Sequence, residues 1–259
     1  MYWIKKNLPK IVISPSFALL AWFVYGFILW TAYISFTKSK ILPKYDLWGV
    51  GQYFRLWSMD RWHTSVSNLF IYTVLFLTLC IVIGVILAIL LDQKIRGEGV
   101  LRTIYLYPMA LSFIVTGTAW KWIMNPTMGI EKFFIDIGFV NFTFDWLVTS
   151  GMSIYCVVIA GVWQSSGFIM AIFLAGLRSI DDEIIKAAKI DGAGIFSIYT
   201  KIVLPMMRPV FMSAIVILVH LSIKSYDLII ALTAGGPGTS SDMPAIFMTQ
   251  YAFNRSEVA

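Results

Sequence analysis

Long uncharged stretches alternate with short charged segments along the chain. Four stretches contain no Asp, Glu, Lys or Arg, and a fifth contains only two of them: 11–37, 67–91, 103–120, 151–177 and 209–241. At about 1.5 Å per residue, helices of this length cross most or all of a hydrocarbon core about 30 Å thick. The stretches lack a two-residue alternation over about ten residues, so the pattern predicts membrane helices rather than barrel strands.

The predicted architecture is an all-α, polytopic helical bundle in a lipid bilayer. We expect residues 1–259 to form one transmembrane domain. The predicted spans and the loop between the last two are about 11–37, 67–91, 102–124, 151–177 and 208–233, with the loop at 178–207.

Composition excludes the other broad classes. Of the 259 residues, 59% are apolar and 13% charged, and the mean hydropathy is +0.79. Soluble domains average roughly 45–50% apolar and about 25% charged residues, and disordered chains are poorer still in apolar residues. The net charge of +6 is not concentrated in a basic stripe, so we expect no nucleic-acid partner. The cysteines Cys80 and Cys156 lie inside apolar runs, which favours neither a disulfide nor a metal site.

Loop charge predicts the orientation of the chain. Basic residues are denser in the N-terminal segment and in the segments after the second and fourth spans than in the remaining loops. Cytoplasmic loops of membrane proteins carry such an excess. We therefore expect a cytoplasmic N-terminus and a cytoplasmic loop 178–207.

The loop 178–207 has clear helix signals. Ser179 is the predicted N-cap of a first helix, and acidic residues follow where the helix dipole favours negative charge. Asp191 and Gly192 predict a left-handed turn, after which a second short helix runs from about 194 to 204. Such a loop either folds back on itself as a surface element or docks into a groove of another protein.

Several sequence segments resemble a known family. The segments Lys186-AAKIDGA-Gly194, Ile202-VL-Pro205 and Arg208-Pro209 resemble the coupling loop of binding-protein-dependent ABC importer permeases. Two further sets of residues resemble the carbohydrate-uptake branch of that family: Tyr226-DLIIALTAGGP-Gly238 followed by Ala252-Phe253, and Trp163-QSSG-Phe168 with Phe173-LAG-Leu177.

The resemblance implies an inner-membrane transport subunit of a bacterium or archaeon that is not an enzyme. Its implied partners are a second homologous permease, an ATPase dimer and a periplasmic sugar-binding protein. ATP and Mg²⁺ would be used by the ATPases, and this chain would bind no cofactor or metal. In agreement, the P-loop pattern G-x-x-x-x-G-K-[ST] is absent from the sequence, and Gly235–Gly238 predicts a turn. The residues implied to couple to the ATPase are Lys186, Ala187, Ala188, Asp191, Gly192, Ala193 and Phe196.

The sequence departs from the family pattern in two places. Lys186 stands where the family has a leading Glu, so an ion pair made by that Glu is in question, whereas the helix and Gly192 are retained. With Lys224-SYD-Leu228, this lysine resembles the glucose/mannose-type subset. Family members also continue past Ala252-Phe253 into a sixth span, which we expect to be missing from a chain that ends at Ala259.

Polar residues within the fourth and fifth spans are the candidates for a sugar site. A sugar requires hydrogen-bonding groups and an aromatic surface in a pocket closed to lipid. The predicted contacts are Gln164, Ser165, Phe168, Ser222, Ser225, Tyr226 and Asp227. Two alternatives concern these residues: Lys224 and Asp227 stand three apart and could form a structural pair, and the serines could bond their own helices.

Other functions compete with sugar import. A permease for an oligosaccharide, osmolyte or polyol would share every motif, whereas a phosphorylated solute would require arginines inside the spans, where the sequence has none. An intramembrane hydrolase with Ser166 as nucleophile and His220 as base would leave the cytoplasmic loop unexplained.

Overall fold

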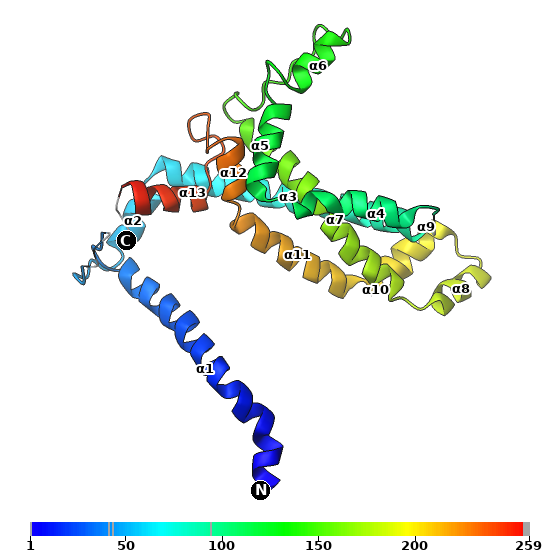
Figure 1. Cartoon of the computed structure of the whole chain (residues 1–259), viewed down its shortest axis with the longest axis horizontal. Helices are drawn as coiled ribbons and strands as arrows, with labels where there is room; N and C mark the ends of the chain where they lie inside the picture. Colours follow the sequence, from blue (N-terminus) through cyan, green and yellow to red (C-terminus); the bar gives the residue numbers. More distant parts are fainter. Residues whose placement is uncertain (1, 41, 43, 94, 256–259) are drawn as a thin grey trace. The chain divides into compact units, whose positions relative to one another are not determined.

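The computed structural model describes residues 2–40, 42, 44–93 and 95–255, and the predicted all-α fold is confirmed (Figure 1). The helices are α1 (Tyr2–Ser35), α2 (Gly51–Trp57), α3 (Asp60–Asp92), α4 (Glu98–Leu106), η1 (Tyr107–Ala110), α5 (Phe113–Ile123), α6 (Ile130–Asp136), α7 (Ser153–Arg178), α8 (Asp182–Ile190), α9 (Ile195–Ile198), η2 (Tyr199–Val203), α10 (Leu204–Met206), α11 (Arg208–Ile223), α12 (Asp227–Leu232), α13 (Pro244–Thr249) and η3 (Gln250–Asn254). They form two compact units, residues 1–62 with 248–259 and residues 63–247.

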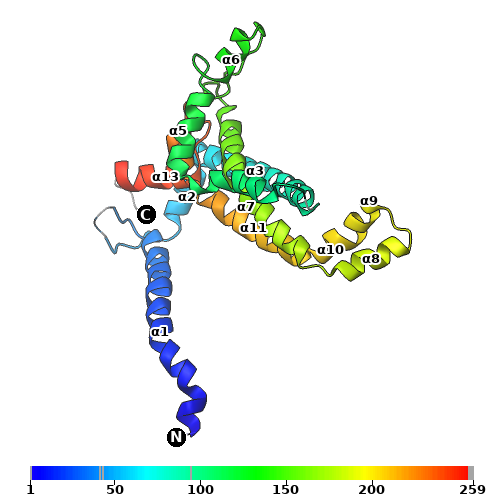
Figure 2. The ribbon, with the colours of Figure 1, turned by 45° about the vertical axis from the view of Figure 1, so that its right-hand side comes forward.

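Helix α7 is the central element of the larger unit. Two thirds of its most apolar window is buried, against about a quarter for α3. The buried face of α3 repeats every three or four residues from Ser65 to Leu91, as expected for one stripe of a helix. Glycines allow the two helices to approach closely: a Cβ at Gly84 would meet Ile169, and one at Gly161 would meet the hydroxyl of Tyr72. In both views, the hairpin formed by α8 and α9 lies beyond the C-terminal end of α7 (Figure 2).

Three of the predicted spans are single helices. Among the described residues, the segments Val12–Ser35, Asp60–Asp92 and Ser153–Arg178 are long and apolar enough to cross a membrane, and two bent helix pairs bring the total there to as many as five. None of the residues in the apolar window of α1 is buried within this chain, and most of them are exposed. An exposed apolar surface of this extent fits contact with lipid or with other membrane helices.

The expected third span, 102–124, is broken rather than continuous. Helix α4 with η1 meets α5 at an angle of 99°. Pro108 lies in η1, Leu111 is extended, and Ser112 caps α5 by accepting a hydrogen bond from the Val115 N–H at 3.3 Å. A proline that cannot donate and a serine that starts a new helix account for the break.

The expected fifth span, 208–233, is also interrupted. Helix α11 begins after a 65° bend at Met207 and ends at Ile223, and α12 starts only at Asp227. Neither proline nor glycine occurs at 224–226, which explains why the sequence pattern missed this break. The side chain of Ser225, inside the break, lies next to the hydroxyl of Tyr72 on α3.

Candidate functional site

The first helix of the coupling loop starts two residues later than predicted. Asp181, not Ser179, is the N-cap of α8, and its Oδ1 accepts a hydrogen bond from the Glu183 N–H at 2.9 Å. Ser179 belongs to the end of α7, where its hydroxyl donates to the Gly176 carbonyl at 2.7 Å. The local bond back to α7 removes Ser179 from the capping role.

The predicted left-handed turn at Gly192 is confirmed. Its φ is +80°, and the two hydrogen bonds that close α8 run from the Gly192 N–H to Lys189 O and from the Ala193 N–H to Ala188 O. This pair of bonds is the Schellman arrangement, in which a left-handed residue satisfies the last carbonyls of a helix. The backbone of the loop is therefore closed without help from another chain.

The predicted coupling residues lie mostly on the outside of this hairpin. Ala188 is buried and Ala193 is half-buried, whereas the other five are exposed: Lys186, Ala187, Asp191, Gly192 and Phe196. Phe196 is 82% exposed and Ile190 is 86% exposed. Two large apolar side chains at the end of a protruding hairpin are typical of a surface that another protein covers.

The second half of the loop is anchored to the helical core. Helices α9, η2 and α10 follow one another directly, and Ile198 and Val203 are buried among them. The side chain of Gln93, just past the end of α3, donates to the Tyr199 hydroxyl at 3.2 Å. The hairpin is thus attached to α3 as well as to α7 and α11.

A charged cluster that the sequence analysis missed connects three helix ends beside the loop. Arg178, the last residue of α7, donates through Nη2 to Glu98 Oε1 at 2.7 Å, and its Nε lies 3.6 Å from Asp92 Oδ1. Glu98 begins α4 and Asp92 ends α3. An arginine at a helix C-terminus and a glutamate at a helix N-terminus are also favoured by the helix dipoles.

Among the candidate sugar contacts, Ser222 has a structural partner. It is fully buried, accepts a hydrogen bond from Thr73 Oγ1 at 3.0 Å and donates to Val219 O at 2.8 Å. Ser222 therefore fastens α11 to α3. Thr73 and Ser222 are polar residues inside two long apolar runs, and this is the sequence signal that could have indicated the contact.

The residues after Ser222 lie in and beyond the break. Ser225 and Tyr226 are half-buried, and Asp227 is exposed at the first position of α12. Helix α11 ends at Ile223 and α12 begins at Asp227, so the i, i+3 geometry predicted for Lys224 and Asp227 does not exist, and no ion pair joins them in the described part of the chain.

The candidates on α7 occupy a different environment. Gln164 is 3% exposed and its Nε2 donates to the Leu111 carbonyl at 2.8 Å, at the break between η1 and α5. Its Oε1 is buried without a hydrogen-bond partner among the described residues. Ser165 is buried and Phe168 is half-buried against the core. Within that same part of the chain, no hydrogen bond joins these three residues to 222–227.

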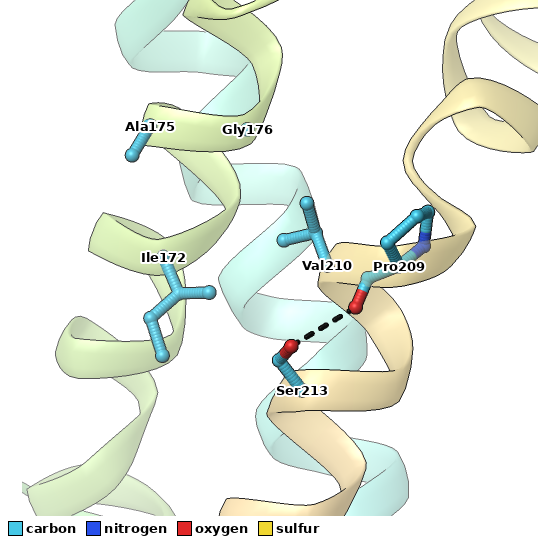
Figure 3. A pocket seen from close by; sticks show the side chains of 6 residues that line it. All are labelled: Ile172, Ala175, Gly176, Pro209, Val210 and Ser213. Atoms are coloured by element: carbon cyan, nitrogen blue, oxygen red, sulfur yellow. Dashed lines mark hydrogen bonds between the residues drawn. The ribbon is translucent and has the colours of Figure 1, made fainter. Parts of the chain in front are cut away.

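A separate groove lies between α7 and α11 (Figure 3). Its volume is about 400 Å³, and it is lined by Ile172, Ala175, Gly176, Pro209, Val210 and Ser213. The Ser213 hydroxyl donates to Pro209 O at 3.0 Å, and every other lining side chain is apolar. The groove lacks the hydrogen-bonding groups that a sugar requires.

Neither a metal centre nor the hydrolase pair is found in the described residues. They contain no group of three His, Cys, Asp or Glu that could hold a metal ion. Ser166 is half-buried on α7 and His220 is exposed on α11, with no hydrogen bond joining them in the residues that the structure covers. The segment at Gly235–Gly238 is a turn, as predicted, and it is held by a hydrogen bond between the hydroxyls of Thr233 and Ser241 at 2.7 Å.

Comparisons with known proteins agree with this arrangement. Residues 80–256 match the family described as "Binding-protein-dependent transport system inner membrane component". The chain is 39% identical over 257 residues to a probable ABC transporter permease protein of Pyrococcus horikoshii, covering 98% of this chain and 88% of that protein. It is 36% identical over 247 residues to the xylose/arabinose import permease protein XacH of Haloferax volcanii, covering 94% and 77%.

The fold has a solved counterpart. The crystal structure of a bacterial alginate ABC transporter in complex with an alginate pentasaccharide-bound periplasmic protein contains a chain that matches with a TM-score of 0.82 at 17% identity, covering 98% of this chain and 86% of that one. The family match covers more than half of the sequence and includes the whole coupling loop. This chain therefore belongs to the binding-protein-dependent transport system inner membrane components, which are permease subunits of ABC transporters and not enzymes.

Proposed function

We propose that this chain is a permease subunit of an ATP-driven importer that carries a neutral sugar, in particular a monosaccharide such as glucose or mannose. The hairpin formed by α8 and α9 carries the proposal. It closes its own backbone and exposes Ile190 and Phe196, which suits docking into a partner ATPase. The import permease XacH, to which the chain is similar, is named for xylose and arabinose.

The same proposal includes the partners and the orientation. The N-terminus and the loop 178–207 would face the cytoplasm, where an ATPase dimer binds the hairpin. A second homologous permease would lie beside this chain in the membrane, and a periplasmic sugar-binding protein would deliver the solute. ATP binding would then move the hairpin and rearrange the spans by alternating access.

Neutral substrates fit the polar groups available along the spans. Gln164 Oε1 is an unused buried acceptor, and leaving such an atom unsatisfied costs about 1–3 kcal/mol, so a substrate hydroxyl or a water fits there. Ser165, Phe168, Ser225, Tyr226 and Asp227 are the other proposed contacts, while Ser222 would support them through Thr73. Arg178, the last residue of α7, is engaged by Glu98.

The test is uptake by the complete complex. The permease is co-purified with the subunits encoded beside it and placed in proteoliposomes containing ATP, with the binding protein outside. Radiolabelled glucose, mannose, xylose, arabinose and maltose serve as probes. ATP-dependent uptake of a monosaccharide is the expected result. Uptake of maltose alone would favour the oligosaccharide alternative, and a complex that imports none of the five contradicts the sugar assignment.

A further inference from the structure

The segment 98–111, which contains α4 and η1, is attached to α7 at three points along its length. At one end, Glu98 accepts the 2.7 Å hydrogen bond from Arg178. In the middle, a Cβ at Gly167 would overlap the Tyr105 carbonyl, so the two backbones are in direct contact. Beyond η1, at the far end of this segment, the Leu111 carbonyl accepts the hydrogen bond from Gln164. The segment 98–111 is therefore held to α7 over its whole length.

The third attachment lies at the break in the third span. Leu111 is extended, and its carbonyl faces Gln164 instead of continuing the helix. Inside a membrane, a backbone carbonyl released from a helix needs another donor, because lipid provides none. Gln164 provides that donor from the neighbouring helix and so defines where the segment 98–111 ends and α5 begins.

Through neighbouring helices, the two ends of the segment 98–111 connect to the two candidate regions, the coupling hairpin and the proposed sugar contacts. Arg178 is followed four residues later by the start of α8, the first helix of the coupling hairpin. On the other side of the break, α5 packs on α12: a Cβ at Gly117 would meet Ala231 and the Leu228 carbonyl. Helix α12 begins with Asp227, one of the proposed sugar contacts.

We propose that α4 and α7 move as one body during transport, and that Gln164 is a positioning residue that makes the Leu111–Ser112 break the hinge to α5 and α12. When the coupling hairpin moves, α7 and α4 move together with it, and α5 rotates relative to them at the Leu111–Ser112 break. The proposal rests on the coupling role proposed for residues 178–207.

Distances between spin labels in the assembled complex test the rigid body. Cys80 and Cys156 are replaced by Ala, and exposed positions are labelled in pairs through Val100→Cys with Ala175→Cys, and Val100→Cys with Trp122→Cys. The α4–α7 distance should be the same without nucleotide and with ATP and vanadate, whereas the α4–α5 distance should change. A change in the α4–α7 distance, or an unchanged α4–α5 distance while a label at Lys189→Cys, an exposed position of α8 outside the predicted coupling residues, responds, overturns the proposal. If that label does not respond to nucleotide, the proposed coupling role itself fails.

Substitution of Gln164 tests the positioning role. Gln164→Met keeps the length of the side chain and removes the donor, and Gln52→Met removes a comparable amide-to-carbonyl hydrogen bond in the other unit, where Gln52 Nε2 lies 3.4 Å from Thr37 O. Gln164→Met should broaden the α4–α5 distance distribution and raise the ATP hydrolysed per probe sugar imported roughly fivefold, the factor expected for one lost hydrogen bond. Gln52→Met should change neither. A variant that only raises the sugar concentration for half-maximal uptake, with normal distances and stoichiometry, shows a substrate contact and overturns the positioning role.

Discussion

The candidate functional side chains of the coupling hairpin are mostly exposed, whereas candidates within the spans form hydrogen bonds that hold the helices together. In the hairpin, backbone bonds at Gly192 and Ala193 close the loop, and Phe196 is left exposed. Within the spans, the side chains themselves close the structure, as Ser222 does with Thr73 and Gln164 with Leu111. Gln164 and Ser222 therefore have a structural role whether or not they also contact a substrate. Phe196 on the hairpin, by contrast, is left 82% exposed within the described chain.

The largest effect is expected at the tip of the hairpin. Phe196→Ala should weaken binding of the purified ATPase subunit, because an exposed aromatic anchor of an interface contributes about 2 kcal/mol, or roughly thirtyfold in affinity. Surface plasmon resonance on the permease in nanodiscs measures it. The matched control is Phe139→Ala, which removes another exposed phenylalanine from the loop after α6. Equal losses in the two variants would show that exposure alone, and not a docking surface, is involved.

Gly192→Val should uncouple ATP hydrolysis from transport. A β-branched residue at φ +80° costs about 1–2 kcal/mol, which corresponds to roughly a tenfold lower uptake rate if the hairpin is displaced. Gly194→Val is the control, because Gly194 has an extended backbone with open space around its Cβ position. Uptake and binding-protein-stimulated ATP hydrolysis are measured together. Normal uptake by the Gly192 variant would contradict the role assigned to the turn.

Asp227→Asn should lower sugar uptake more than it lowers assembly of the complex. The carboxylate is exposed and has no salt bridge with Lys224, so its loss removes a hydrogen-bond acceptor without breaking a structural pair. A hydrogen bond to a charged group contributes about 1.5 kcal/mol, so uptake at low sugar concentration should fall roughly tenfold. Asp136→Asn, in the exposed pair with Lys132, is the control. Parallel loss of uptake and assembly would indicate a structural role.

Ser222→Ala should affect stability more than transport. It removes the acceptor for Thr73, and one buried hydrogen bond contributes about 1 kcal/mol to stability. The thermal midpoint of the detergent-solubilised complex measures the change. Ser213→Ala loses only a hydroxyl bonded to its own helix at Pro209 and should leave the midpoint unchanged. A selective loss of uptake in Ser222→Ala at normal stability would place this hydroxyl on the substrate.

The sequence was sufficient for the helical class, for most of the spans and for the glycine turn. Spans are predictable because the cost of charge in lipid leaves long uncharged runs, and Gly192 because few residues adopt a left-handed conformation. The breaks at Leu111–Ser112 and Lys224–Tyr226 were not predicted: the first lies inside an uncharged stretch, and at the second Lys224 and Asp227 were interpreted as an i, i+3 pair on a continuous helix. Pro108 and Ser112 mark the first break, whereas the second has neither a proline nor a glycine to mark it.

The difference between local sequence signals and contacts made by distant helices also explains the errors in the candidate site. Ser179 and Asp181 are equally good caps by residue type, and only the hydrogen bond of Ser179 to Gly176 decides between them. The cluster joins Arg178 to Glu98 and Asp92, which lie 80 and 86 positions earlier in the chain, so no local pattern indicates it. Local signals predict how a segment begins and ends, whereas the use of a polar side chain depends on which helix lies beside it.

The self-contained closure of the hairpin has a thermodynamic consequence for assembly. Ordering a flexible loop removes backbone freedom equivalent to about 1–2 kcal/mol per residue. Because the bonds at Gly192 and Ala193 already hold α8 and α9 in shape, that freedom is lost when the chain folds and not when the proposed ATPase partner binds. The hairpin is a preorganised ligand, and association can proceed by rigid docking of a shape that exists beforehand.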